Sequence, residues 1–323
     1  MCRFNNKKEV LAIIGNGFDL AHEYQTGYPS FVAKVSNPAL SEFKKFCDES
    51  KIETWHDLEN SINNLTNEFF MQSYAEGGNE EENRDKSAYL RKIFTRIQYL
   101  LAGYLREEIN SKPLVKKASV SKHLDSNATA ICFNYTDTAE KYIDDIFYVH
   151  GSLKEDDILL GYDYRPEGCL AKFNDMCWGK IICREALEFR RMLRRELHLC
   201  SEDVKFKELC DSLELYQSCE LSGRGIDDEV EHNIPNYTFV KTFIDDHREY
   251  HTIPNIDYKA IKTIVVLGHG IEADKVYLDS IIKECTNIKQ IVLFTYENES
   301  KDDLDRKIKF LKDYCPTIDI VKY

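Results

Sequence analysis

The chain has 323 residues, 43% of them hydrophobic and 31% charged, with only 14 Gly and 7 Pro. That composition is typical of a globular protein with a large core, as one domain or two, and it leaves little sequence for flexible linkers or low-complexity tails. The 56 acidic and 43 basic side chains give a net charge of −13. No broad positive field would attract a nucleic-acid backbone, which argues against nucleic acid as a partner.

The eleven cysteines form no C-x-x-C pair and no Cys/His zinc spacing, so we expect reduced thiols and no bound metal. The first ten residues, MCRFNNKKEV, contain no apolar signal core, and no run of 18 or more apolar residues occurs. These features predict a cytoplasmic protein without a membrane segment.

Short apolar runs rich in β-branched residues predict the strands of one sheet. In chain order they are Val10–Ile14, Ala128–Phe133, Phe147–Val149, Ile158–Leu160, Thr263–Leu267, Gln290–Thr295 and Asp319–Tyr323. Runs such as IVVL and IVLF lack polar alternation, which is typical of strands that are covered on both faces. We therefore predict an α/β fold with a mainly parallel, Rossmann-like sheet flanked by helices.

Helical periodicity fills much of the sequence between these runs. Apolar residues recur every three or four positions from Ser87 to Ile109, which predicts one long amphipathic helix. We interpret residues 165–255 as a helical insertion or cap within a single α/β domain of residues 1–323.

Within that insertion, helical spacing runs from about Cys183 to Leu215, and the polar stretch Ser222–Asn236 is predicted to be a loop. The arginines between Arg184 and Arg195 alternate with glutamates, so we interpret them as ion pairs on a helix surface.

The first predicted strand ends in Gly15-Asn16-Gly17, directly before a predicted helix. A glycine-rich turn of this kind frees backbone N–H groups beside a helix N-terminus and can receive an anion. The usual G-x-G-x-x-G pattern is incomplete, because Leu20 stands where the third glycine belongs. The alternative is an ordinary strand-to-helix connection with Asp19 as the helix cap.

Three other predicted strands also end in polar or glycine residues. They are followed by Asn134 in ICFNYTD, by His150 in YVHGSL, and by Gly268, His269, Gly270 and Asp274 in VVLGHGIEADKVYL. In an open parallel sheet the ligand site lies beyond the carboxyl ends of the strands, so we expect these residues to converge. For each one a structural role is the alternative: a helix cap for Asn134, a satisfied histidine for His150, and a tight turn for the glycines.

The blocks IIGNGFDLAHEYQTGYPSF, WHDLE, FNYTD, VHGSL and LGHGIEAD together resemble the bacterial abortive-infection family AbiH, which are phage-defence proteins. That family in turn resembles the sirtuin-like NAD-binding fold. Sirtuin-type proteins have Gly-Ile-Pro-x-Phe after the Gly-x-Gly turn, and this chain has Gly27-Tyr28-Pro29-Ser30-Phe31 after a longer spacer. This chain departs from sirtuin-type proteins in three ways. It has Asp19 in place of a serine, its acidic residue Asp137 comes three residues after Asn134 and not two, and it lacks zinc-binding cysteine pairs.

The resemblance implies a phage-defence protein that binds NAD and hydrolyses its nicotinamide–ribose bond. It implies that His150 is the base, that Asn134 positions water or ribose hydroxyls, and that Asp19 stabilises the developing cation. The implied NAD-binding residues are Gly15, Asn16, Gly17, Phe31, Gly268, His269, Gly270 and Asp274.

The alternatives are a sensor that binds NAD or ADP-ribose without turnover and, less favoured because of the acidic chain, a toxin-like nuclease. A phage-derived trigger and a homo-oligomer are further expectations that the sequence leaves open.

Overall fold

The computed structural model describes residues 8–53, 57–59, 61–62, 64–65, 80–125, 127–155, 157–158, 160, 189–190, 192–194, 197–199, 203–221, 234–248, 256–271, 274–296 and 299–323. The chain divides into two compact units. Unit 1 comprises Met1–Phe31, Ala102–Ile158 and Tyr250–Tyr323, and unit 2 comprises Val32–Leu101 and Leu159–Glu249. The predicted domain bounds, with 165–255 as an insertion, stay a prediction.

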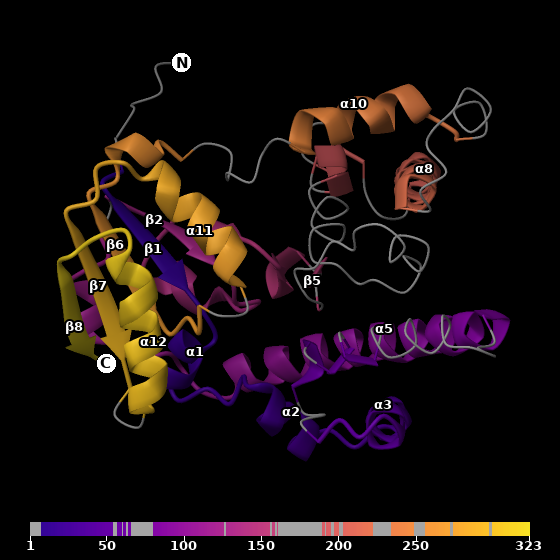
Figure 1. Cartoon of the computed structure of the whole chain (residues 1–323), viewed down its shortest axis with the longest axis horizontal. Coiled ribbons are helices and arrows are strands. Elements are labelled where there is room, and N and C mark those ends of the chain that lie inside the picture. The colour runs from indigo at the N-terminus through magenta and orange to yellow at the C-terminus, as the bar shows by residue number, and fades with distance from the viewer. Residues whose placement is uncertain are drawn as a thin grey trace. The chain divides into compact units, whose positions relative to one another are not determined.

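Unit 1 is built on a six-stranded sheet in the order β3-β2-β1-β6-β7-β8, shown in Figure 1. All neighbouring strands are parallel. The strands are β1 (Val10–Ile14), β2 (Ala128–Cys132), β3 (Ile146–Tyr148), β6 (Thr263–Leu267), β7 (Gln290–Thr295) and β8 (Ile318–Lys322). The sheet runs outward from β1 in both directions, as in Rossmann-type dinucleotide-binding folds. The predicted fold class, a mainly parallel Rossmann-like sheet with helices, is confirmed.

The central strands are buried on both faces, so their side chains enter two separate cores. On one face Leu11 and Ile13 pack with residues of α11 and α12, which lie in front of the sheet in Figure 1. On the other face Ala12 and Ile14 pack with α1, α6 and η1. These helices are α1 (Gly17–Ala21), α6 (Ala118–Ser121), η1 (Asp137–Lys141), α11 (Lys275–Glu284) and α12 (Lys301–Lys312). This double coverage explains the unbroken apolar runs in the sequence.

The surface helix α12 shows how local sequence sets a helix boundary. Ser300 is its N-cap, and the Ser300 hydroxyl accepts a hydrogen bond from the backbone N–H of Asp303. Aspartates lie in the first turn and lysines in the last, an arrangement that complements the helix dipole. The remaining short elements of unit 1 are β4 (Gly151–Ser152), η2 (Leu153–Glu155), β5 (Asp157–Ile158) and η4 (Tyr258–Ala260).

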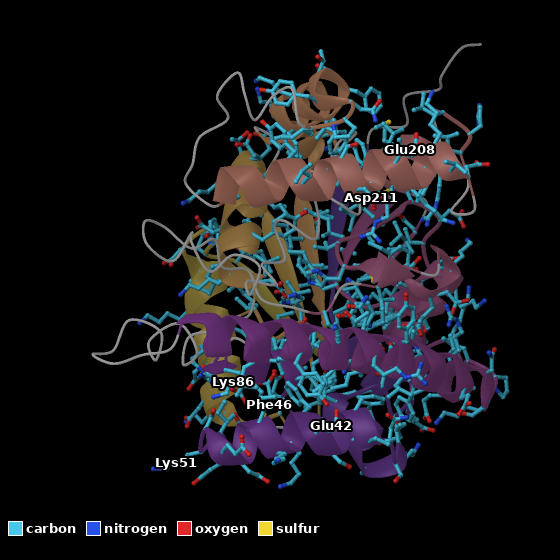
Figure 2. The ribbon with its side chains drawn as sticks, turned by 90° about the vertical axis from the view of Figure 1, so that its right-hand side faces the viewer. Glu42, Phe46, Lys51, Lys86, Glu208 and Asp211 are labelled. Atoms are coloured by element: carbon cyan, nitrogen blue, oxygen red, sulfur yellow. The ribbon has the colours of Figure 1, made fainter. Side chains whose placement is uncertain are left out.

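Unit 2 contains helix pairs packed through aromatic side chains. In Figure 2 the labelled residues Glu42 and Phe46 lie on α3, beside the long helix α5. The Tyr89 hydroxyl of α5 donates a hydrogen bond to the Glu42 carboxylate (2.9 Å), and Phe43 contacts Phe94 with ring centroids 5.9 Å apart. A second pair, α8 and α10, encloses its own apolar core around Phe189. The bounds are α3 (Pro38–Glu49), α5 (Glu80–Asn110), α8 (Val204–Leu221) and α10 (Tyr237–Arg248). Both α2 (Tyr28–Lys34) and α5 contain residues of each unit.

Several local predictions need correction. The run Ile158–Leu160 is not part of the main sheet: β5 ends at Ile158 and pairs antiparallel with β4 in a two-stranded sheet. The helix predicted for Ser87–Ile109 begins earlier, at Glu80. Leu197, an apolar residue of the segment Cys183–Leu215 that we predict to be helical, is 41% exposed and lies in a bend. Much of that insertion, including most of the predicted loop Ser222–Asn236, lies outside the described residues. Among those described, no helix combines the length and the apolar character needed to cross a membrane.

The turn after β1 docks tightly against the loop after β6. The backbone N–H of Gly15 donates to the carbonyl of Leu267, and the N–H of Gly17 donates to the carbonyl of Gly268, both at 2.9 Å. Gly268 has a φ of +63°, and a Cβ added there would lie 2.1 Å from the backbone nitrogen of Phe18. The contact between the turn after β1 and the loop after β6 therefore requires glycine at position 268.

We expect Gly268→Ala to lower the free energy of unfolding by about 3 kcal/mol, because it adds left-handed strain and a clash with the backbone. Gly270→Ala is the matched control, since a Cβ at Gly270 meets no atom within 4 Å, and its effect should stay within about 0.5 kcal/mol. Urea unfolding followed by circular dichroism measures both. Equal effects in the two variants would contradict this account of the turn.

Candidate functional site

The candidate site is formed at the carboxyl edge of the six-stranded sheet. Because all six strands are parallel, the residues that follow them emerge at the same edge. Gly15 follows β1, Phe133 and Asn134 follow β2, Val149 and His150 follow β3, and Gly268 and His269 follow β6. Strand order reverses between β1 and β6, and in open α/β sheets this switch point is where ligands bind.

His150, Asp274 and His269 form a buried cluster at this edge. The Asp274 carboxylate lies between the two imidazoles, with Oδ1 3.4 Å from His150 Nε2 and Oδ2 3.3 Å from His269 Nε2. The three residues are 3–6% exposed. Phe133 packs edge-on against both imidazole rings, at centroid distances of 5.5 Å to His150 and 4.3 Å to His269. Residues from three strand ends are thus brought together by one carboxylate and one aromatic ring.

Asp19 and Asn134 form a second polar group at the same edge. Asp19 is fully buried in the first turn of α1, and its Oδ2 accepts a hydrogen bond from the Thr136 hydroxyl (2.7 Å). Thr136 in turn contacts Thr138, hydroxyl to hydroxyl, at 3.3 Å. Within the described part of the chain, Oδ1 of Asp19 and Oδ1 of Asn134 are buried without a hydrogen-bond partner. The Thr138 and Asn134 side chains also act on the Asp19 carboxylate and lower its pKa, but neither Oδ1 atom receives a hydrogen bond of normal geometry. Buried acceptors of this kind call for a functional explanation.

Asp19 is also perturbed electrostatically. Burial is the largest influence and raises the pKa of its carboxyl from 3.8 to about 6, while the hydrogen bond from Thr136 opposes the rise. Burial disfavours the charged form of an acid. Near neutral pH Asp19 is therefore mostly ionised, at a cost to the folded state.

The helix N-caps in the structure exclude the capping roles considered for Asp19 and Asn134. The N-cap of α1 is Asn16, so Asp19 is not the cap of that helix. The N-cap of η1 is Thr136, so Asn134 does not cap the segment that follows it.

The glycine turn uses most of its amides within the protein. Phe18, Asp19 and Leu20 donate to the carbonyls of Gly15 and Asn16, so the described bonds from Gly15 to Leu20 leave only the Asn16 N–H without an acceptor. Asn16 itself is exposed, and its Oδ1 accepts a hydrogen bond from the Thr26 hydroxyl (2.7 Å). The turn therefore leaves one backbone amide, that of Asn16, for an anion.

Tyr296 fills the space beside Gly17. A Cβ at Gly17 would lie 1.2 Å from the Tyr296 hydroxyl oxygen and 2.8 Å from the Gly268 carbonyl oxygen. A valine at position 17 would thus disturb the packing of the turn whether or not a ligand is present, and it cannot serve as a selective test of nucleotide binding.

The other predicted binding residues have varied surroundings. Phe31 is fully buried, and its ring contacts Tyr104 with centroids 5.5 Å apart. Gly268 is required by the turn, whereas Gly270 is exposed and borders open space. Their role in binding stays a prediction. Among the described residues, no group of His, Cys, Asp and Glu has the geometry to hold a metal ion.

Sequence reasoning missed three residues of this edge: Phe133, Thr136 and Tyr296. Phe133 was assigned to the strand itself, although it is the first residue beyond β2. Tyr296 directly follows β7, so the strand-end argument that selected His150 would also have selected it. Thr136 lies within the FNYTD block, but nothing in the sequence indicates that it faces Asp19.

Of the three comparisons with known proteins, one gave a match. Neither the comparison with curated proteins nor that with solved structures gave a match, and the sirtuin-like relationship stays a prediction. A family model described as Bacteriophage abortive infection AbiH matches residues 11–296. Because that match spans most of the chain and every strand end described above, the protein belongs to the AbiH family and has a role in abortive-infection defence against phage.

Proposed function

We propose that this protein binds NAD at the carboxyl edge of its sheet and hydrolyses the nicotinamide–ribose bond. The observation that carries the proposal is the convergence of Asn134 and His150, from adjacent strands, on the same edge as the buried Asp19. Histidine is the side chain most often used as a general base in catalysis. The strand order around β1 and the switch point beside β6 add support.

The two buried acceptors without a donor fit a sugar ligand. Asp19 Oδ1 and Asn134 Oδ1 need hydrogen-bond donors, and ribose hydroxyls supply them. The Asp19 carboxylate would also stabilise positive charge that develops on the ribose as the leaving pyridine departs. The Asn16 N–H is the amide of the glycine turn that would contact the diphosphate.

The reaction balances with water as the only co-reactant. The C1′–N bond breaks with its electron pair remaining on nicotinamide, which leaves neutral, and the water oxygen bonds to C1′. His150 takes the proton that water loses and later releases it to solvent. Asn134 holds the attacking water or the ribose, so that the reacting atoms meet in the required geometry.

We expect purified protein to release nicotinamide from NAD, with phage lysate added in a parallel reaction to supply a trigger. General-base loss costs on the order of 10²–10⁴ in rate, so His150→Ala should remove most turnover while NAD binding persists. His123→Ala is the control, because His123 precedes β2 and its ring contacts Phe294 of β7, which is not one of the proposed site residues.

Chromatographic measurement of nicotinamide and calorimetric measurement of NAD binding give both quantities. Binding without nicotinamide release in either reaction would support a sensor that does not turn over. Neither binding nor release would overturn the proposal.

We expect Asp19→Asn to stabilise the fold and to lower activity. The pKa of Asp19 is higher in the folded chain, about 6 against 3.8, so the folded state binds more protons between these values and loses stability as pH rises through them. Asparagine can still accept the Thr136 hydrogen bond. The gain in unfolding free energy should be about 3 kcal/mol at pH 7 and below about 1 kcal/mol at pH 4.

Urea unfolding at the two pH values tests this expectation. Asp48→Asn is the control, because Asp48 is exposed and forms an i,i+4 ion pair with Lys44, so its effect should be below about 0.5 kcal/mol at both pH values. An Asp19→Asn gain that did not change between pH 4 and pH 7 would show that Asp19 does not carry a buried charge.

A further inference from the structure

Asp274 occupies a helix N-cap position without acting as a cap. It immediately precedes α11, yet its side chain makes no capping hydrogen bond. A buried carboxylate is costly unless its charge is compensated. Here its two oxygens instead face His150 Nε2 and His269 Nε2, at 3.4 Å and 3.3 Å. The geometry at the start of α11 thus serves the two histidines.

The tautomer of His269 is fixed by the backbone. The N–H of Ile271 donates a hydrogen bond to His269 Nδ1 (2.9 Å), so Nδ1 is an acceptor and the proton of the neutral ring lies on Nε2. That Nε2–H faces Oδ2 of Asp274. The second oxygen of the carboxylate, Oδ1, is therefore the one available to His150.

Ile271 adopts a backbone conformation that is costly for its residue type. Its φ is +68°, in the left-handed region that β-branched residues rarely enter. Its N–H holds His269, and its carbonyl accepts a hydrogen bond from the N–H of Asp274 (3.1 Å). Strain of this kind persists where the surrounding structure holds it in place, and it concentrates at functional sites. The strained residue Ile271 thus holds both His269 and Asp274 through its backbone.

We infer that Asp274 and His269 position His150 for proton transfer. Both residues are predicted from the sequence to bind NAD, and in the structure the Asp274 carboxylate lies between His150 and His269. Asp274 orients the Nε2–H of His150, which leaves Nδ1 as the nitrogen that accepts the proton from water, and the carboxylate then stabilises the imidazolium. His269 holds the carboxylate in place through its second oxygen. Such contacts are often long without substrate and tighten when it binds.

The expected change in kcat rests on the proposed NAD hydrolysis. The expected tautomers of His150 and His269 do not. Nuclear magnetic resonance of histidine labelled with ¹⁵N in both ring nitrogens reports each tautomer without any turnover. In the unmodified protein, we expect both His269 and His150 to carry their proton on Nε2. In Asp274→Asn, His269 should keep its tautomer because Ile271 holds it, whereas His150 should become a mixture. Signals are assigned with His150→Gln and His269→Gln.

Kinetics supply the second test. Asp274→Asn should lower kcat on the order of a hundredfold or more, with KM changing less than about threefold, since it removes orientation of the base and not substrate contacts. His269→Gln, whose amide can still donate to the carboxylate, should retain more activity than His269→Ala. Asp279→Asn is the control: Asp279 lies in α11 and pairs with the exposed Lys283, so neither constant should change.

The outcomes separate the two proposals. If no variant hydrolyses NAD but the tautomers behave as expected, the proposed reaction fails and the positioning cluster stands. A proton on Nδ1 of His269, or a His150 tautomer unaffected by Asp274→Asn, would overturn the inference. An Asp274→Asn variant that raised KM and left kcat unchanged would also overturn it, because that result assigns Asp274 to substrate binding.

Discussion

The position of β1 between β2 and β6 is the constraint on which the site depends. Val10 is paired with Ala128 on one side and with Thr263 on the other, so three distant parts of the sequence start from the same level of the sheet. Each of these strands then runs five residues before it ends. Equal length and common register bring Gly15, Phe133 and Gly268 out at one edge. A slip in either pairing would separate Asp274 from His150.

The same edge concentrates features that oppose stability. Asp19 carries a charge in a fully buried position, Ile271 holds a left-handed backbone, and Asn134 keeps an acceptor without a donor. Other departures in unit 1 are scattered: Glu23 has a left-handed backbone, and Glu299 and Tyr323 each keep a buried side-chain oxygen without a hydrogen-bond partner among the described residues. Several departures that gather at one place are typical of functional sites. Their concentration at this edge indicates a site more strongly than any single residue does.

The sequence predicted the strands well because strands that are buried on both faces consist of uninterrupted runs of apolar residues. It failed for Ile158–Leu160, since a two-residue ladder such as β5 is determined by its tertiary partner β4 and not by its own apolar run. Strand-end reasoning selected Asn134, His150, His269 and Asp274, and the structure places Asp274 immediately before α11. The bridging role of Asp274 was not predictable, because it depends on the left-handed turn at Ile271, and isoleucine gives no signal of that conformation. The filling of the Gly17 position by Tyr296 depends equally on contacts far apart in the chain.

The division of unit 1 among three chain segments has a consequence for the timing of its synthesis. Glu9 and Lys262, whose side chains pair beside β1 and β6, are 253 positions apart. A ribosome making this protein therefore displays β1 long before its neighbour β6 exists, and contacts of such sequence separation form slowly. The loop that carries His269 and Asp274 is translated after β1, β2 and β3 have all emerged. An incomplete nascent chain thus holds His150 without its carboxylate partner, and the cluster is assembled only when translation has passed α11.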